Sequence, residues 1–327
     1  MKALIFEAPG RAVVSDVEQP RIGPDDVLVR SQVVGICHSD FELYEGRYII
    51  PVSYPIIPGH EWSGTIAEVG ANVTGLRPGD LVVGECVVGP GGRDHFGFSI
   101  SGADAEYFVA RGEWIHLLPE GLTATHGALV EPFSVAYNAV VCAGAVNPSD
   151  VVAVIGGGPI GLLCAMAAAA CNATVVLVEP QATRRARGLE IGARAALDPG
   201  AHDFADGVAE LTGGRGFDVV IEAAGAPAAM AQALEIAGQG ARVVYVGIAI
   251  GASVPAQLGL IQSKALCIRG VIGSAGVWPQ TIRFLASGVV DPTAIVTATF
   301  PLGDALAALA AARDTASNVK VQILTGA

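Results

Sequence analysis

A glycine-rich run that directly follows an apolar segment constrains this fold more than any other feature of the sequence. Val151–Ile155 is continuously apolar, as expected of a strand buried on both faces of a parallel sheet. The run 156–161, Gly-Gly-Gly-Pro-Ile-Gly, leads into an alanine-rich helix over Ile160–Cys171, and a second apolar strand follows at Thr174–Val178. Strand, glycine turn, helix and strand in this order predict a doubly wound α/β sheet.

Further segments extend this alternation. A helix is expected over Gln181–Ile191, and buried strands are expected over Phe217–Glu222 and Ala241–Gly247. The tail of the chain adds an alanine- and leucine-rich helix over Asp304–Ala312 and a final strand over Val319–Leu324. The segment that starts with the strand Ala241–Gly247 is a candidate for pairing with a second subunit.

The N-terminal part of the chain has a different sequence pattern. Short apolar strands at Val27–Arg30, Thr65–Val69 and Leu81–Val83 are separated by turns such as Arg77–Asp80. Many short strands with such turns predict a β-rich, barrel-like domain. Because 327 residues exceed what a single core usually organises, two domains are expected.

The charge balance excludes several classes of partner. A net charge of −12 argues against nucleic acid and against an anionic membrane surface. The sequence has no apolar stretch of the length of a membrane span, and Met1–Phe6 is too short and too quickly polar for a signal peptide. The 6 cysteines are widely spaced, which indicates reduced thiols, so we expect a cytoplasmic protein.

The glycine run matches the G-x-G-x-x-G pattern in the strand-to-helix context that a dinucleotide-binding turn requires. Gly156 permits the tight turn, Gly158 allows the backbone to approach a pyrophosphate, and Gly161 lets the helix pack closely on the sheet. Pro159 and Ile160 complete the turn at the helix N-terminus, which favours phosphate charge.

The acidic residue that ends the second strand indicates which cofactor binds. Glu179 follows Thr174–Val178, where a carboxylate holds the ribose hydroxyls of the adenosine. A carboxylate there repels a 2′-phosphate, so NAD is favoured over NADP. The nearby Arg184 weakens this preference, because a guanidinium could accept the phosphate.

A possible metal site lies in the N-terminal part. Cys37 and His60 offer a thiolate and an imidazole, which are ordinary zinc ligands. A catalytic zinc site needs three protein ligands and one open position. The third ligand could be Glu61 or Glu131, and the sequence leaves this choice open.

These motifs together resemble the zinc-containing medium-chain dehydrogenase/reductase family over nearly the whole chain. The motifs stand in the order of that family: G-I-C-x-S-D at 35–40, P-G-H-E at 58–61, E-P-x-x-V-A at 131–136, G-x-G-P-I-G at 156–161 and G-x-R-V-V-x-V-G at 240–247. In its glutamate at position 131 the chain resembles the polyol and sugar branch of the family. The run Pro58–Gly64 is similar to the corresponding run of polyol, threonine and aminocyclitol dehydrogenases.

The resemblance implies a domain organisation and an activity. It implies a GroES-like catalytic zinc domain over residues 1–132, an NAD-binding Rossmann domain over 133–273, and a return of 274–327 to the catalytic domain. It also implies hydride transfer between NAD and a secondary hydroxyl of a polyol, sugar, cyclitol or amino alcohol. Members of the family assemble as dimers or tetramers, so a homo-oligomer is expected.

The resemblance also implies a mechanism with named residues. Zinc lowers the pKa of the substrate hydroxyl. Ser39 takes the proton from the substrate and passes it toward water. Glu42 either continues this path or is only a solvated surface residue. Asp40 accepts a hydrogen bond from the far nitrogen of His60. Ile160 packs behind the nicotinamide ring.

The chain departs from the family in one lobe. Zinc members usually carry four closely spaced cysteines after the position of Cys86, whereas the segment 85–95 holds one cysteine and is shortened. We therefore expect one catalytic zinc and no structural zinc. Two alternatives remain: a zinc-free quinone or enoyl reductase of the same fold, and an NAD-binding protein without activity.

Overall fold

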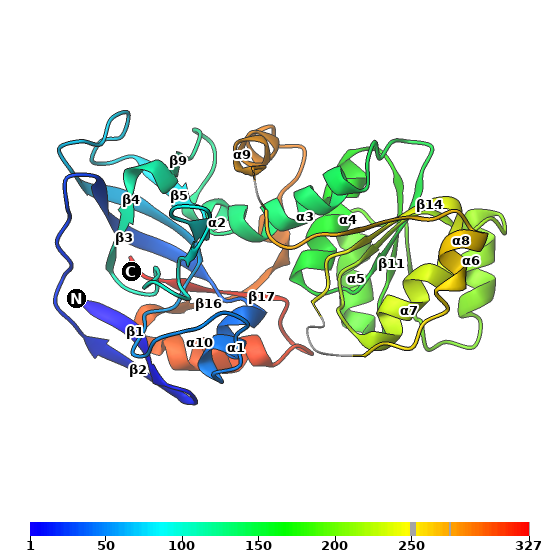
Figure 1. The fold of residues 1–327 in the computed structure, drawn as a ribbon, viewed down its shortest axis with the longest axis horizontal. Helices are drawn as coiled ribbons and strands as arrows, with labels where there is room; N and C mark the ends of the chain where they lie inside the picture. The colour runs from blue at the N-terminus through cyan, green and yellow to red at the C-terminus, as the bar shows by residue number, and fades with distance from the viewer. Residues whose placement is uncertain (249–252, 275, 327) are drawn as a thin grey trace. The chain divides into compact units, whose positions relative to one another are not determined.

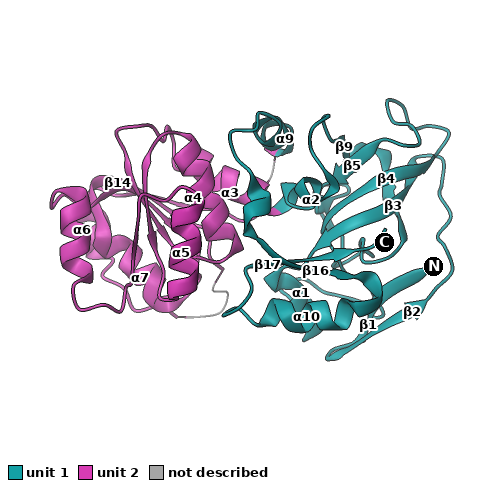
Figure 2. Ribbon diagram, turned by 180° about the vertical axis from the view of Figure 1, so that it is seen from behind, with its two compact units in different colours: residues 1–131, 278–327 teal, residues 132–277 magenta. Residues whose placement is uncertain are grey.

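The computed structural model describes residues 1–248, 253–274 and 276–326 (Figure 1). The chain divides into two compact units, one formed by Met1–Glu131 with Trp278–Ala327 and the other by Pro132–Val277 (Figure 2). The divisions expected from the sequence lie after residues 132 and 273. The helix α3 (Val130–Cys142) begins in the first unit and continues into the second.

The first unit contains a seven-stranded, mostly antiparallel sheet. Its strand order is β16-β17-β3-β4-β5-β9, with β8 paired to β3. The strands of this sheet are β3 (Asp26–Gly35), β4 (Glu61–Val69), β5 (Leu81–Gly84), β8 (Tyr107–Arg111), β9 (Ile115–Leu117), β16 (Val296–Pro301) and β17 (Lys320–Leu324). Two small hairpins accompany it: β1 (Lys2–Ala8) with β2 (Arg11–Asp16), and β6 (Val87–Val88) with β7 (Asp94–His95).

Short helices complete this unit. They are α1 (His38–Tyr44), α2 (Ala124–Gly127), α9 (Trp278–Ala286) and α10 (Ala305–Arg313), with 3-10 turns at Gly112–Trp114, Pro292–Ile295 and Leu302–Asp304. The C-terminal strand β17 pairs antiparallel with the end of β3, where Gln322 lies opposite Gly35. The strand β17 therefore lies beside the segment that leads into Cys37 (Figure 1).

The second unit is a six-stranded parallel sheet with strand order β12-β11-β10-β13-β14-β15. The strands are β10 (Val151–Ile155), β11 (Thr174–Val178), β12 (Ala195–Leu197), β13 (Phe217–Glu222), β14 (Ala237–Tyr245) and β15 (Cys267–Gly270). Its helices are α4 (Pro159–Ala170), α5 (Ala182–Glu190), α6 (Phe204–Thr212), α7 (Pro227–Ile236) and α8 (Gly259–Ser263). The strand order reverses between β10 and β13, which is where such sheets bind ligands.

This sheet confirms the predicted doubly wound fold and corrects one detail. The residues Ala241–Gly247 were expected to offer a strand for pairing with a second subunit. They belong mostly to β14, which lies inside the sheet between β13 and β15, so its hydrogen-bonding edges are already used. The terminal strands of this sheet are β12 and β15. Among the described residues, no helix is both long and apolar enough to cross a membrane.

Candidate metal and cofactor sites

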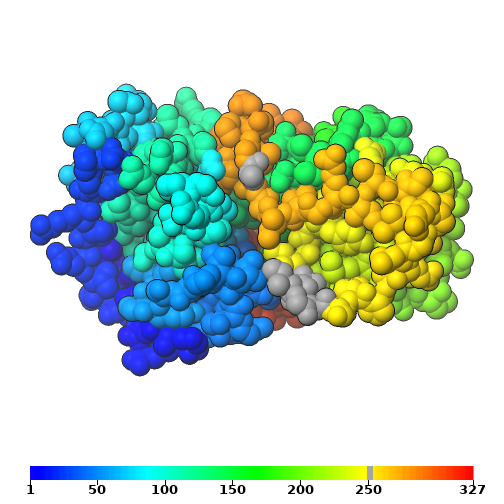
Figure 3. All heavy atoms as spheres, viewed as in Figure 1, coloured from blue at the N-terminus to red at the C-terminus, as the bar shows by residue number. Residues whose placement is uncertain are grey.

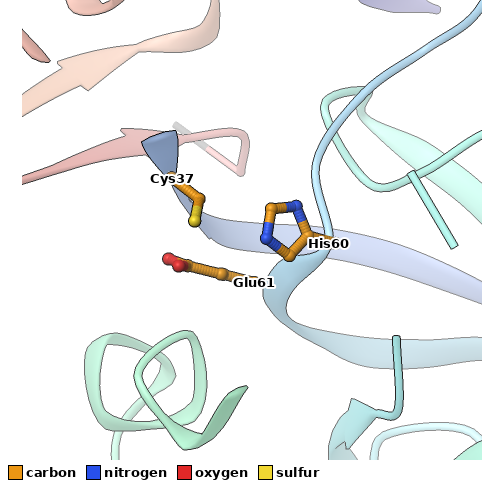
Figure 4. Close-up of side chains that lie close together, drawn as sticks. All are labelled: Cys37, His60 and Glu61. Atoms are coloured by element: carbon orange, nitrogen blue, oxygen red, sulfur yellow. The ribbon is translucent and has the colours of Figure 1, made fainter. Parts of the chain in front are cut away.

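Three predicted ligands meet in the first unit. The ligand atoms of Cys37, His60 and Glu61 all lie within 4.8 Å of one another. Figure 4 shows the Cys37 sulfur, one ring nitrogen of His60 and the Glu61 carboxylate directed toward a common point. Sulfur, nitrogen and oxygen donors at this spacing are a suitable set for zinc.

Strand pairing explains why these residues meet. Cys37 follows β3 and is the N-cap of α1, whereas His60 and Glu61 stand at the start of β4. The two strands are antiparallel, and Gly35 lies opposite Glu61. A side chain at Gly35 would collide with the Glu61 carboxylate, so glycine is required there for this approach.

His60 is 3% exposed, and its Nδ1 lies 3.4 Å from Asp40 Oδ1. This separation is longer than an ordinary hydrogen bond, so the bond expected from Asp40 is not formed at normal length. Asp40 Oδ2 instead accepts the backbone N–H of Cys37 at 2.8 Å, which holds the start of α1. Burial alone would lower the pKa of His60, but the Asp40 carboxylate and the Cys37 thiol outweigh it and raise that pKa well above its usual value.

Glu61 has a partner that the sequence analysis missed. The Lys320 ammonium contacts Glu61 Oε2, and both side chains are almost fully buried. Lys320 also donates to the Ile36 carbonyl oxygen at 2.9 Å. The signal in the sequence was a lysine at the start of the strand Lys320–Leu324, whose other residues are mostly apolar, because a buried charge requires a partner.

Glu131 stands in the first turn of α3. It is not a member of the group of three ligand atoms. Burial raises the pKa of Glu131 to about 7; the charges of His60 and Lys320 lower it, and that of Glu61 raises it. These influences place the Glu131 carboxyl within electrostatic reach of the same centre.

Two predicted proton-relay residues lie on α1. Ser39 and Glu42 are three positions apart in this helix, and each is partly buried. Residues three apart in a helix share a face, so their side chains can act along one path.

The shortened lobe places aromatic residues beside His60, which the sequence analysis did not anticipate. Phe98, which follows the β6–β7 hairpin, has its ring centroid 4.5 Å from that of His60. The Tyr48 ring stacks on Phe98, with the two ring centroids 4.4 Å apart. Cys86, in the same segment as Phe98, is partly buried and packs against this apolar core.

A buried carboxyl lies next to this centre. Asp104 is 4% exposed, and its Oδ1 has no hydrogen-bond partner among the described residues. Burial raises the pKa of Asp104 well above its usual value; the charges of Asp40 and Glu61 add to this effect, and His60 opposes it.

The glycine turn of the second unit lies between β10 and α4. Gly156 has φ of +103°, and a Cβ there would lie 2.9 Å from the Ala224 nitrogen. A Cβ at Gly161 would lie 1.9 Å from the Gly156 carbonyl oxygen, so only glycine lets the helix approach the strand. Gly158 is the N-cap of α4, Pro159 is its first residue, and Ile160 follows.

Glu179 and Arg184 both lie against this turn. Glu179 Oε2 accepts the Gly157 backbone N–H at 2.6 Å, and its Oε1 accepts that of Gln181 at 2.8 Å. A Cβ at Gly157 would lie 3.1 Å from the Arg184 Cβ. Glu179 and Arg184 therefore lie at the same turn.

Comparisons with known proteins identify relatives of both units. Residues 159–287 match the family profile described as zinc-binding dehydrogenase, and residues 23–120 match the alcohol dehydrogenase GroES-like domain. The chain is 32% identical to a putative D-xylulose reductase of Agrobacterium fabrum over 99% of each chain. It is 31% identical to the sorbitol dehydrogenase of Bacillus subtilis, covering 92% of this chain and 90% of that protein.

A solved structure agrees as well. The fold matches a putative zinc-binding dehydrogenase of Sinorhizobium meliloti bound to NADP, with a TM-score of 0.92 and 30% identity over 99% of each chain. The matches cover both units and both sites. The chain therefore belongs to the zinc-dependent medium-chain dehydrogenase family, in its polyol dehydrogenase branch.

Proposed function

We propose that this polyol dehydrogenase holds one catalytic zinc on Cys37, His60 and a carboxylate, and transfers hydride between a secondary hydroxyl and NAD. The observation that carries the proposal is the convergence of the Cys37, His60 and Glu61 ligand atoms within 4.8 Å. A zinc-free reductase has no use for such a group. A protein that only binds NAD has no use for it either.

The residues present fit the metal. His60 Nδ1 faces Asp40, which leaves Nε2 for a metal. A zinc ion bound there would lower the pKa of a substrate hydroxyl toward neutrality. Asp40 holds the start of α1 through the Cys37 N–H. Ser39 accepts the substrate proton, and Glu42 provides a path toward water.

Of the two candidate carboxylates, we assign the third ligand to Glu61, whose ligand atom lies within 4.8 Å of those of Cys37 and His60. Glu61 Oε2 contacts the Lys320 ammonium, and the carboxylate has a second oxygen that can bind a cation. Glu131 stands in the first turn of α3, outside this group of ligand atoms.

The cofactor is assigned as NAD. Glu179 is 4% exposed and hydrogen-bonds the backbone of the glycine turn, which supports a role in binding the adenosine ribose. Arg184 lies next to this carboxylate, and the relative from Sinorhizobium meliloti is bound to NADP, so the choice requires a direct measurement.

We also propose that the protein forms a homodimer or a homotetramer. The strand β15 is the last strand of its sheet, and its residues Cys267, Arg269 and Gly270 are exposed. A free strand edge can pair with the same edge of another chain. Light scattering should give a multiple of the 33.2 kDa chain mass, and a single-chain mass would contradict this part.

Metal analysis tests the main proposal. Protein purified without chelators should contain about one zinc per chain, and Cys37→Ser should lose it. Cys267→Ser is the matched control, because that thiol is exposed in the second unit. Glu61→Gln should lower the zinc content more than Glu131→Gln, with Glu120→Gln as the control for an exposed glutamate.

Each other result has a defined meaning. Two zinc ions per chain would show that the segment 85–95 binds a second metal. No zinc in protein made with ample metal would overturn the proposal and favour a zinc-free reductase, to be assayed on quinones and enones with NADH and NADPH. Zinc without oxidation of any polyol, cyclitol or amino alcohol would favour a protein that binds the cofactor without activity.

A further inference from the structure

A buried carboxylate holds the loop that follows β13, residues 223–226, which we call the β13 loop. Glu222 is the last residue of the strand and is fully buried. Its Oε1 accepts the backbone N–H groups of Ala224 at 2.9 Å and of Gly225 at 2.8 Å. Burial raises the pKa of Glu222, and these two N–H groups oppose the rise. The carboxylate therefore fixes the conformation of the β13 loop.

The same residue also holds the start of the loop that follows β14, residues 246–248, which we call the β14 loop. The Glu222 carbonyl oxygen accepts the backbone N–H groups of Val246 at 2.8 Å and of Gly247 at 3.0 Å. A Cβ at Gly247 would lie 2.1 Å from the Gly225 nitrogen and 2.6 Å from Glu222 Oε2, so only glycine permits this approach. Glu222 thus connects the two loops to each other.

The topology of the sheet places both loops at the cofactor site. They follow the carboxyl ends of β13 and β14, beyond the point where the strand order reverses between β10 and β13. A dinucleotide lies across this reversal, with one mononucleotide over each half of the sheet. The glycine turn and Glu179 belong to the half with β10 and β11, which takes the adenosine. The β13 and β14 loops therefore belong to the half that takes the nicotinamide.

The loops are accessible to a ligand, whereas Glu222 is not. A Cβ at Gly156 would lie 2.9 Å from the Ala224 nitrogen, so the β13 loop is directly beside the glycine turn. Ile248 in the β14 loop is 60% exposed. In Figure 3 the part of the chain around residues 220–248 (yellow) is visible at the surface of the second unit. Because Glu222 is fully buried, it can act on a ligand only through these loops.

We propose that Glu222 is a positioning residue for the cofactor, and that its carboxylate holds the β13 and β14 loops in the conformation that binds the nicotinamide half. This inference rests on the proposed function. Loops that are already ordered lose little conformational entropy when a ligand binds. Without the carboxylate, the N–H groups of Ala224 and Gly225 lose their partner, so the β13 loop rearranges to find another.

Two ligands that differ only by the nicotinamide ring, NADH and ADP-ribose, test the inference by calorimetry. We expect the wild type to bind NADH more tightly than ADP-ribose. Glu222→Met, which fills the same space without an acceptor, should weaken NADH by about tenfold and ADP-ribose by less than about twofold. Glu222→Gln should stay within about threefold of the wild type for NADH, because an amide oxygen also accepts two N–H groups. Glu210→Met, at an exposed glutamate of α6, is the matched control.

Hydrogen exchange of the wild type provides a measurement that needs no variant. NADH should slow exchange over residues 223–226 more than ADP-ribose does, because only NADH carries the group that these loops bind. The same exchange with both ligands would overturn the inference, even if Glu222→Met does not fold.

The binding results discriminate in the same way. Equal losses of NADH and ADP-ribose affinity in Glu222→Met would indicate a general structural role and overturn the inference, as would unchanged NADH binding. A Glu222→Gln variant as weak as Glu222→Met would also overturn it, and so would equal wild-type affinities for the two ligands. A wild type that binds neither ligand would refute the proposed function and this inference with it. A protein that binds NADH as expected but oxidises no alcohol would refute the proposed activity alone.

Discussion

The Lys320 ammonium contacts the Glu61 carboxylate in the interior of the first unit, and the two residues are 2% and 1% exposed. They belong to β4 and to the C-terminal strand β17, which are far apart in the sequence. A buried charge is tolerated only when a partner compensates for its lost hydration. The C-terminal strand therefore neutralises a residue of the candidate metal centre, and the truncation of this strand would affect the site directly.

Removing the lysine charge should destabilise the first unit. Lys320→Met leaves the Glu61 carboxylate buried without a counter-charge, so we expect a loss of about 3–5 kcal/mol in the free energy of unfolding. Urea unfolding followed by tryptophan fluorescence measures it, because Trp62, Trp114 and Trp278 all lie in this unit. Lys2→Met, at an exposed position, is the control and should change stability little. A loss below about 1 kcal/mol would mean that Glu61 is compensated by another group.

The buried carboxyl of Asp104 predicts a pH dependence. Its folded-state pKa is raised by burial, so the folded protein is penalised once the carboxyl ionises. This penalty grows as the pH rises above about 4, where the unfolded chain releases the proton, and levels off above the folded-state pKa. Asp104→Asn should therefore gain stability relative to the wild type with rising pH, by at most about 1.4 kcal/mol per pH unit. Urea unfolding of the metal-free proteins between pH 4 and 8 measures the difference, and a stability difference that falls with pH would refute the assignment.

The carboxylate of Glu179 predicts the cofactor preference. The wild-type protein should bind NADH at least about tenfold more tightly than NADPH, because the fixed charge repels a 2′-phosphate. Glu179→Gln should reduce this ratio, mainly by weakening NADH. Fluorescence titration with both cofactors measures the ratio. Glu190→Gln, which alters an exposed glutamate at the end of α5, serves as the control. Tighter binding of NADPH by the wild type would show that Arg184 dominates the site.

A strained alanine offers a stabilising substitution. Ala265 is exposed and has φ of +51°, a conformation that costs a residue with a Cβ about 1 kcal/mol. Ala265→Gly removes this cost, so we expect the second unit to gain up to about 1 kcal/mol. Ala186→Gly, at an exposed position within α5, is the matched control and should instead destabilise by about 1 kcal/mol. Urea unfolding followed by circular dichroism compares the two, and a destabilised Ala265→Gly variant would contradict the strain.

Local patterns were sufficient for much of the second unit. The strands at Val151–Ile155, Thr174–Val178 and Phe217–Glu222 have the bounds that their apolar runs predicted. The helix after the glycine turn starts one residue earlier than expected, at Pro159, because proline is favoured in a first helical turn, where its missing N–H is not needed. Such features depend on residues close together in the sequence.

The sequence by itself determined the parallel sheet, the glycine turn with Glu179 at its side, and Cys37 and His60 as candidate ligands, because each depends on a local motif. Only the tertiary structure decided which residues surround those ligands. Lys320 contacts Glu61 because β17 pairs with β3. Phe98 contacts His60 because of the conformation of the segment that follows the β6–β7 hairpin, and no periodic pattern in the sequence predicts that conformation. Contacts between distant segments depend on strand register and side-chain packing, which are properties of the whole fold and have no local sequence signal.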